Sequence, residues 1–400
     1  MCQFFKKIFF LAGFILTTMS ACSSAQPIYS LDKVPLIPLP STVVPSDEVM
    51  PLDAIQSIRT LGAEEELISM AQNFKSFWKK HTEQELLLPD DTGYGDNAIT
   101  LIIDNDFSPQ QEAYKLEITS DEISVKGKTA EGIFRGLKTL EQLVVLSKLQ
   151  GKSNFLSLPG GKITDQPSYA YRGAMLDVAR HFFSVADVKR YIDLLSTYKI
   201  NFLHFHLSDD QGWRIEIKSW PLLAKTGGQT QVGGGEGGFY TQEDFREIVE
   251  YAADRFITIV PEIDLPGHTN AALASYAELN CDGKATSLYT GIKVGFSTLC
   301  VDKEVTYEFV EDVIREISEI SPGPYFHIGG DESLVTPEED FNRFMDRTLA
   351  IVKKYNKTPM GWYELITADI PEETLLQYWA KTEDFSKVIP KKSKILISAA

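Results

Sequence analysis

The pattern of apolar and polar positions changes near residue 169. From there onward, short apolar runs alternate with longer segments in which apolar residues recur at helical spacing. Segment 184–199 shows this spacing and opens with Ser184, a residue type favoured at helix N-caps. A repeated strand-then-helix order is typical of parallel strands joined by helical crossovers.

This alternation predicts seven strands with helices between them. The strands are expected at 171–178, 201–208, 257–264, 324–330, 358–364, 375–380 and 394–400. Helical crossovers are expected at 184–199, 241–255, 305–320 and 338–355.

The preceding part of the chain has a different pattern. It combines strand-like runs with one helical segment, at 98–104, 113–119, 122–127 and 131–146. We interpret residues 41–165 as a small α/β domain and residues 166–400 as a second domain, with the junction near the sequence DQPSY.

Polar and aromatic residues gather at the predicted C-terminal ends of the later strands. In a parallel β/α barrel this face carries the active site. An open doubly wound sheet is the alternative, but no glycine-rich phosphate-binding sequence follows the first strand. The predicted fold is therefore a (β/α)8 TIM barrel preceded by the small α/β domain. Because the seventh strand runs to Ala400, we expect the eighth strand to be missing and the barrel to be C-terminally incomplete.

The first residues have the pattern of an export signal. Lys6 and Lys7 precede an apolar run over 8–16, which is too short to span a membrane, and small residues follow it. The pattern predicts that the protein is secreted.

Ser20 and Ala21 directly before Cys22 resemble a bacterial lipobox. Residues 1–21 are therefore predicted to be a lipoprotein signal peptide, with Cys22 lipidated and residues 22–40 acting as a polar, proline-rich tether. An ordinary signal peptide with an incidental cysteine is the alternative. We expect an exported bacterial lipoprotein, anchored by lipid in the periplasm, the outer membrane or the cell surface.

Export also bears on the remaining cysteines, Cys281 and Cys300. In an oxidising compartment two such cysteines predict a disulfide, with two free buried thiols as the alternative. The net charge of −17 argues against a nucleic-acid partner, because phosphate binding needs clustered lysine and arginine.

The strongest candidate for chemistry is the sequence HIGGDES, which places Asp331 and Glu332 after an apolar run. A carboxyl group in a semi-apolar pocket has a raised pKa and can act as a general acid. Glu332, following a Gly-Gly bend, fits that role, and Asp331 would orient the substrate. His268, after a strand and a Pro-Gly turn, is expected between Asp209 and Glu332, where it would set the protonation state of the acid. A capping or core histidine is the alternative.

Tryptophans follow three predicted strands, at Trp213, Trp362 and Trp379. Each alone is more often a core residue, but together they suggest the walls of a sugar pocket.

A metal site is a competing hypothesis. His204 and His206 share one face of a strand, and a site with His268, His327 and Asp331 can be imagined. The two histidines precede the strand end, however, so we expect them to fill the barrel interior. No metal and no organic cofactor are predicted.

Several of these stretches together resemble glycoside hydrolase family 20, the β-N-acetylhexosaminidases, over about residues 35–400. The matching stretches are YRGAMLDVARHFF, HFHLSDDQGWRIEI, VPEIDLPGHTNAALASYAELNCDG, YTGIKVGFSTLCVDK, YFHIGGDES, GWYE and QYW. The resemblance implies an exo-acting bacterial hydrolase that removes terminal β-linked GlcNAc or GalNAc with retention. In this family the 2-acetamido group of the substrate is the nucleophile, and an oxazolinium intermediate forms.

The resemblance also implies roles for individual residues. Glu332 matches the general acid and base, Asp331 the residue that holds the acetamido N–H, and Asp209 and His268 the partners that tune the acid. Asp264 is implied as a supporting carboxylate.

Three further positions match substrate-binding residues of the family. Arg180 corresponds to the arginine that binds the hydroxyls of the non-reducing-end sugar, and Trp362 and Trp379 to the walls around the acetamido methyl. The family's tyrosine after strand seven and its aromatic residue near strand eight are not matched here. A non-catalytic glycan-binding lipoprotein on the same fold is therefore the alternative function.

Overall fold

The computed structural model describes residues 29–61, 65–88, 97–150, 156–379 and 393–398. The predicted signal peptide and the lipidation site Cys22 lie outside these residues. In the part of the chain that is described, no helix combines the length and apolar character needed to cross a bilayer.

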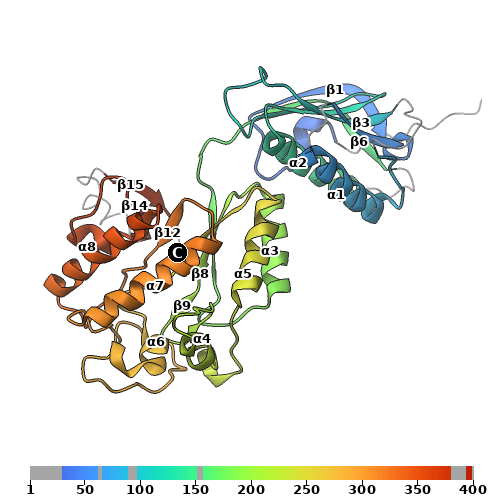
Figure 1. The fold of residues 1–400 in the computed structure, drawn as a ribbon. Coiled ribbons are helices and arrows are strands. Elements are labelled where there is room, and N and C mark those ends of the chain that lie inside the picture. Colours follow the sequence, from blue (N-terminus) through green and yellow to red (C-terminus); the bar gives the residue numbers. More distant parts are fainter. Residues whose placement is uncertain (1–28, 62–64, 89–96, 151–155, 380–392, 399–400) are drawn as a thin grey trace, which may run out of the picture.

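The first domain is a mixed sheet with two helices on one face (Figure 1). Its strands are β1 (Thr42–Pro51), β2 (Ser57–Leu61), β3 (Ala98–Ile103), β4 (Tyr114–Ile118), β5 (Ile123–Gly127) and β6 (Ser157–Asp165), arranged in the order β1-β6-β4-β5-β3-β2. The helices are α1 (Glu65–Thr82) and α2 (Ala130–Gln150). Phe74 and Trp78 of α1 pack with buried residues of α2 and the sheet to form the core of this domain.

Part of the predicted tether packs on the first domain. The short 3₁₀ helix η1 (Leu31–Lys33) places Leu31 in the core, where 1% of its surface is exposed, and Leu36 is buried beside it. The Gln142 side chain accepts a hydrogen bond from the Ile37 N–H and donates one to its carbonyl. Residues 31–37 are thus held against the folded domain.

The second domain is a curled parallel sheet with helices on its outer side (Figure 1). Its strands are β7 (Gly173–Asp177), β8 (Phe202–His206), β11 (Thr258–Glu262), β12 (Tyr325–His327), β13 (Thr358–Trp362), β14 (Leu375–Tyr378) and β15 (Lys394–Ile397). They pair in chain order, and each pair is parallel. The seven predicted strands are confirmed, and the sheet has the curvature of an incomplete (β/α)8 barrel.

The predicted crossover helices are confirmed as well. They are α3 (Val185–Thr197), α5 (Gln242–Ala253), α7 (Glu304–Ile320) and α8 (Glu338–Lys354). Ser184 caps α3 as expected, accepting a hydrogen bond from the Asp187 N–H in a capping box. Shorter elements that the periodicity did not predict lie in the loops beyond the strand ends: the hairpin β9 (Ser208–Asp209) and β10 (Gly212–Trp213), α4 (Leu222–Gly227) and α6 (Asn270–Ser275).

Charged side chains buried at the junction connect the two domains. Lys199, from the turn before β8, donates hydrogen bonds to Asp165 at 3.0 Å and to the Tyr114 hydroxyl at 2.8 Å. Glu112 of the first domain accepts hydrogen bonds from Arg135 of α2 and from Arg172 of the second domain. Such buried pairs need partners on both sides, so they fix the junction between the domains.

Candidate active site

The register of the parallel sheet brings the predicted site residues to one edge. Glu262 pairs with both His206 and His327, so β8, β11 and β12 end at the same level. The loops that follow these strands supply Asp209, His268, Asp331 and Glu332. Strand ends of a parallel sheet meet at one face, and here they place these four residues together.

Asp209 is the most highly connected of these residues, and 1% of its surface is exposed. Its Oδ2 accepts hydrogen bonds from His206 Nε2 at 3.0 Å and lies 2.8 Å from an Arg180 nitrogen. Its Oδ1 accepts from His268 Nδ1 at 3.2 Å. Burial alone would raise the pKa of Asp209, but these hydrogen bonds and charges hold it well below the ordinary value.

Arg180 is held between two carboxylates at the end of β7. It lies 2.8 Å from both Asp177 Oδ2 and Asp209 Oδ2, and about a third of its side chain remains exposed. Asp177 also accepts hydrogen bonds from the backbone N–H groups of Ala179 and Arg180. The guanidinium group is therefore rigidly placed with one side open to a ligand.

His268 lies between Asp209 and the acidic pair, as predicted. Its Nε2 is 3.7 Å from Asp331 Oδ2 and 3.6 Å from Glu332 Oε2. Burial acts to lower the pKa of His268, but the hydrogen bond to Asp209 and nearby carboxylates outweigh it and raise the pKa to about 9. At neutral pH the ring is a cation, and its Nε2–H faces both acids.

The Gly-Gly bend before Asp331 and Glu332 has a steric cause. Gly329 has φ +67°, and a Cβ there would lie 1.8 Å from Asp264 Oδ1, so no other residue fits. Gly330 donates its N–H to the same Asp264 oxygen at 3.0 Å. Glu332 itself has φ +43°. Its side chain is 36% exposed, so it reaches toward solvent at the C-terminal ends of the strands.

Asp264 and Asp331 lie close together, with side-chain oxygens of both within 4.8 Å of each other and of a His268 ring nitrogen. Burial, followed by the charges of Asp331 and Glu262, raises the pKa of Asp264 well above its ordinary value. Burial also raises the pKa of Asp331, and the His268 charge opposes this shift. Within the described residues, Asp331 Oδ1 is buried without a hydrogen-bond partner and is available to a substrate donor.

Trp362 at the end of β13 and Trp379 just after β14 contact each other. Their ring centroids are 6.2 Å apart and the rings meet nearly edge to face, at 70°. The structure does not place Trp213 with them. Trp213 is 1% exposed and packs against Phe309 in the core, so its interpretation as a pocket wall was wrong.

The histidines of the competing metal hypothesis lie inside the sheet around Glu262. His204 Nε2 and His206 Nδ1 are each 2.6 Å from Glu262 Oε2, and His327 Nδ1 is 3.2 Å from Oε1. Ligand atoms of His204, Glu262 and His327 lie within 4.8 Å of one another, which a metal site would also require. Because two histidines contact the same carboxylate oxygen directly, the geometry fits hydrogen bonding better than a shared ion.

Charge is balanced within this interior cluster. Burial would raise the pKa of Glu262, but the neighbouring histidines hold it well below the ordinary value. His206 is the matching cation, because Glu262 and Asp209 raise its pKa well above the ordinary value despite burial. Burial lowers the pKa of His327 to about 4, so that ring is neutral.

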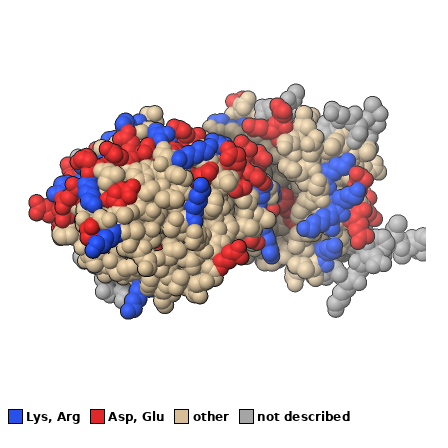
Figure 2. All heavy atoms as spheres, turned by 60° about the horizontal axis from the view of Figure 1, so that its bottom comes forward, with Lys and Arg blue, Asp and Glu red and all other residues tan. Residues whose placement is uncertain are grey.

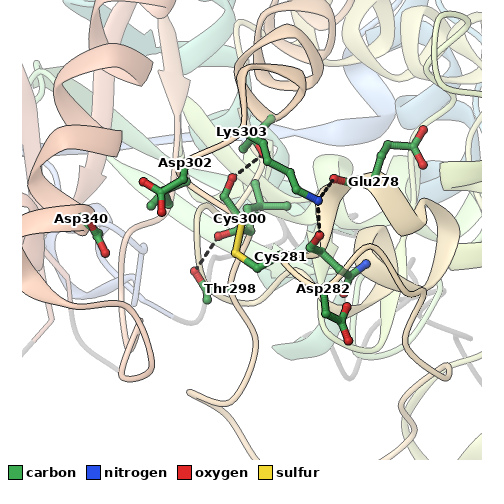
Figure 3. Close-up of a disulfide and its surroundings, with 12 residues drawn as sticks. Glu278, Cys281, Asp282, Thr298, Cys300, Asp302, Lys303 and Asp340 are labelled. Atoms are coloured by element: carbon green, nitrogen blue, oxygen red, sulfur yellow. Dashed lines mark hydrogen bonds between the residues drawn. A yellow bond between two sulfur atoms is a disulfide. The ribbon is translucent and has the colours of Figure 1, made fainter.

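The disulfide predicted from the sequence is present. Cys281 and Cys300 are joined with an S–S distance of 2.07 Å, and Figure 3 shows Lys303 beside the bridge, reaching the Glu278 carbonyl. The loop closed by the bridge carries Ser297, whose hydroxyl accepts a hydrogen bond from the Thr269 N–H at 2.9 Å. The bridge therefore helps to hold the turn that contains His268.

Three residues of the site were missed by sequence reasoning. Glu262 lies within a strand, and Glu364 follows Trp362 in the 3₁₀ helix η5 (Tyr363–Thr367). Arg214 is fully buried and organises the loops by donating hydrogen bonds to the carbonyl oxygens of Val178, Ala179, Gly228, Thr230 and Gly238. For Arg214 the available signal was its place in the DDQGWR stretch, where a cation follows two acids.

Charged side chains are unevenly distributed on one face of the molecule (Figure 2). On the face visible in Figure 2, lysine and arginine side chains lie among aspartate and glutamate at the rim of the second domain, and the middle of that face is largely uncharged.

Comparison with known families assigns both domains. Residues 33–166 match glycosyl hydrolase family 20, domain 2, and residues 169–339 match the glycosyl hydrolase family 20 catalytic domain.

Relatives with curated functions agree with this assignment. The β-N-acetylhexosaminidase of Cellulomonas fimi is 41% identical over 287 residues, which is 72% of this chain and 57% of that protein. The β-hexosaminidase of Porphyromonas gingivalis is 34% identical over 392 residues, covering 91% of this chain and 50% of that protein. The chain spans little more than half the length of these two relatives.

Solved structures show the same fold. The GH20 β-N-acetylhexosaminidase from Streptomyces coelicolor has a TM-score of 0.85 and 44% identity, covering 91% of this chain and 74% of that chain. A mutant β-hexosaminidase of Streptomyces plicatus in complex with product (GlcNAc) has a TM-score of 0.86 and 43% identity, covering 94% and 76%.

The raised pKa of His268 predicts a specific pH dependence of stability. A group whose pKa rises from 6.5 to about 9 on folding contributes stability that is fully present below pH 6.5 and lost as the pH rises through 9. We expect His268→Gln to be less stable than the unmodified protein at pH 6, by up to about 3 kcal/mol. The difference should shrink as the pH approaches 10. Urea unfolding at a series of pH values measures it, and a difference independent of pH would show that His268 is not a buried cation.

Proposed function

Since this chain belongs to glycoside hydrolase family 20, we propose that it hydrolyses terminal, non-reducing β-linked N-acetylhexosamine residues of glycans with retention. The proposal depends most on one observation: Glu332 and Asp331 follow β12 side by side, each within 4 Å of the His268 imidazolium. The relatives named above are β-N-acetylhexosaminidases, and one solved neighbour binds GlcNAc.

In the first step, the carbonyl oxygen of the substrate's 2-acetamido group forms a bond to C1. The bond from C1 to the glycosidic oxygen breaks, and Glu332 gives its proton to that oxygen. Asp331 accepts the acetamido N–H through its unpaired Oδ1, which orients the carbonyl and stabilises the positive charge that develops. The product of this step is a cyclic oxazolinium.

In the second step, Glu332 is a carboxylate and takes a proton from water, which attacks C1 and opens the oxazolinium. Two successive inversions at C1 restore the β configuration. His268 can stabilise the Glu332 carboxylate between the steps, because its Nε2–H faces that side chain.

Arg180 and the tryptophans supply binding. The exposed side of the Arg180 guanidinium can donate to sugar hydroxyls, while Asp177 and Asp209 prevent it from moving. Trp362 and Trp379 offer apolar surface for the acetamido methyl.

We also propose that the protein is exported and anchored by lipid at Cys22. The basic, apolar and small-residue regions of the N-terminus support this, and Cys22 lies outside the described residues.

Hydrolysis of chromogenic glycosides by protein isolated from its native source tests the proposal. We expect release of p-nitrophenol from its β-GlcNAc glycoside and inhibition by a thiazoline mimic of the oxazolinium. The β-glucoside, which lacks the acetamido group, should not be hydrolysed. Binding of GlcNAc without hydrolysis would contradict the proposal and favour a glycan-binding lipoprotein.

Glu332→Gln should abolish turnover while sugar binding persists. Loss of a general acid typically lowers the rate by about 10²- to 10⁴-fold. Because Arg180 and the tryptophans are unchanged, GlcNAc should still bind in calorimetry. A matched control is Glu338→Gln, at the start of α8 on the surface. Near-normal turnover by Glu332→Gln would show that another group is the acid.

A further inference from the structure

Each tryptophan of the pocket wall donates its indole N–H to a carboxylate. Trp362 Nε1 is 3.0 Å from Glu262 Oε1, and Trp379 Nε1 is 3.4 Å from Glu364 Oε2. The two indoles also contact each other edge to face. The steps of the proposed reaction use neither carboxylate.

Sheet register explains how Glu262 reaches a tryptophan two strands away. Glu262 on β11 pairs with His327 on β12, and His327 pairs with Met360 on β13. Met360 is therefore at the same level of the sheet as Glu262. Trp362 lies two residues beyond Met360, so its side chain points to the same face of the sheet as that of Glu262. The Trp362 ring therefore lies one pleat repeat above Glu262, with its N–H directed down toward the carboxylate.

Glu262 is a fixed acceptor. It is fully buried, and its other oxygen accepts hydrogen bonds from His204 and His206. The buried charge of His206 keeps Glu262 ionised, so its bond to the indole is charge-assisted and water does not compete for it. His327 packs edge-on against the Trp362 ring, with centroids 5.1 Å apart, and limits its rotation further.

Glu364 holds the second indole in a similar way. It lies in η5, directly after β13, and the Trp379 N–H is the side-chain donor to its carboxyl group. Burial raises the pKa of Glu364 to about 7, consistent with a carboxyl group enclosed at the edge of the site.

We propose that Glu262 and Glu364 are positioning residues that hold Trp362 and Trp379 at a fixed separation and thereby set the size of the N-acyl group that the site accepts. This inference rests on the proposed function, in which the two indoles enclose the acetamido methyl. An indole that loses its N–H acceptor can turn about its side-chain bonds, and the space between the rings widens. The substrate class selected by this arrangement is N-acetyl hexosaminides over those with longer acyl chains.

The site of the unmodified protein should discriminate between N-acetyl and N-propanoyl substrates. One extra methylene in an apolar pocket typically changes kcat/KM by about 10- to 200-fold. The unmodified protein should therefore prefer the p-nitrophenyl β-glycoside of N-acetylglucosamine over its N-propanoyl analogue by a ratio in that range. A residue with only a structural role would change both rates together and leave the ratio unchanged.

The first test compares Glu364→Ala with Glu364→Gln in the full protein. Glu364→Ala removes the acceptor, and the acetyl-to-propanoyl ratio of kcat/KM should fall by about tenfold. Glu364→Gln keeps an acceptor oxygen and should retain the ratio. Glu373→Ala is the matched control, because Glu373 is an exposed carboxylate between β13 and β14 that pairs with Lys353.

The second test applies the same pair of changes at Glu262. Glu262→Ala should lower the ratio in the same direction. Because it also leaves His206 with one fewer partner, its folding must be verified by circular dichroism. Glu262→Gln keeps the size of the side chain but offers one acceptor oxygen to the histidines and the indole, so its ratio should lie between those of the unmodified protein and Glu262→Ala. A folded Glu262→Ala protein with an unchanged ratio would overturn the assignment of Glu262.

The outcomes distinguish failure of the proposed function from failure of the positioning role. If the unmodified protein hydrolyses neither glycoside, the proposed function fails and this inference falls with it. If it hydrolyses both and the ratio is unchanged in a folded Glu364→Ala protein, the positioning role is overturned while the proposed function stands. A lowered ratio in the alanine variant, restored in the glutamine variant, supports the inference.

Discussion

The organisation of the site depends on one buried carboxylate. Asp209 receives hydrogen bonds or charge contacts from Arg180, His206 and His268, and these three partners belong to three different segments of the chain. An ionised carboxylate in the interior is costly unless its oxygens are satisfied, so the surrounding groups must hold these positions for the protein to fold. The same contacts fix one cation, Arg180, beyond the end of β7 and another, His268, beside the acidic pair. The contacts that allow Asp209 to be buried thus also hold Arg180 and His268 in position.

The parallel sheet allows this arrangement because it aligns strand ends that are distant in sequence. Below the mouth, the interior histidines and Glu262 continue the polar network away from Asp209 toward Trp362. On the other side, Asp264 accepts a hydrogen bond from the backbone N–H of Gly330, the residue before the acidic pair. The site therefore extends from Arg180, through buried ion pairs, to Trp362 and Trp379. Each group is positioned by a partner that does not need to touch the substrate.

Much of the fold was predictable because the sequence shows short apolar runs typical of buried strands and apolar residues at helical spacing. Ser184 marked the start of α3, and apolar runs marked all seven strands. The candidate residues Asp209, His268, Asp331 and Glu332 were also predictable, since they follow strands that must end together. Trp213 was misread because the turn between β9 and β10 points it into the core, and strand-end position alone does not give that direction.

Glu262 could not have been recognised from its local sequence. It is a carboxylate inside an apolar strand, and its role depends on cross-strand register with His206 and His327, which one segment does not encode. The same limit applies to Glu364, because its acceptor role depends on Trp379 from the next strand. The positions of helices and strands follow from periodicity, whereas hydrogen bonds between distant side chains follow only from the assembled sheet.

The central claim is that the substrate's own acetamido oxygen attacks C1 while Asp331 and Glu332 assist it. A series of p-nitrophenyl β-glycosides whose N-acetyl group carries zero, one, two or three fluorine atoms tests this claim most directly. Fluorine withdraws electrons from the carbonyl oxygen with little change in size. The account predicts that log kcat/KM falls steadily with each added fluorine. A rate that does not depend on fluorination would contradict participation by the acetamido group and require a nucleophile from the protein or from water.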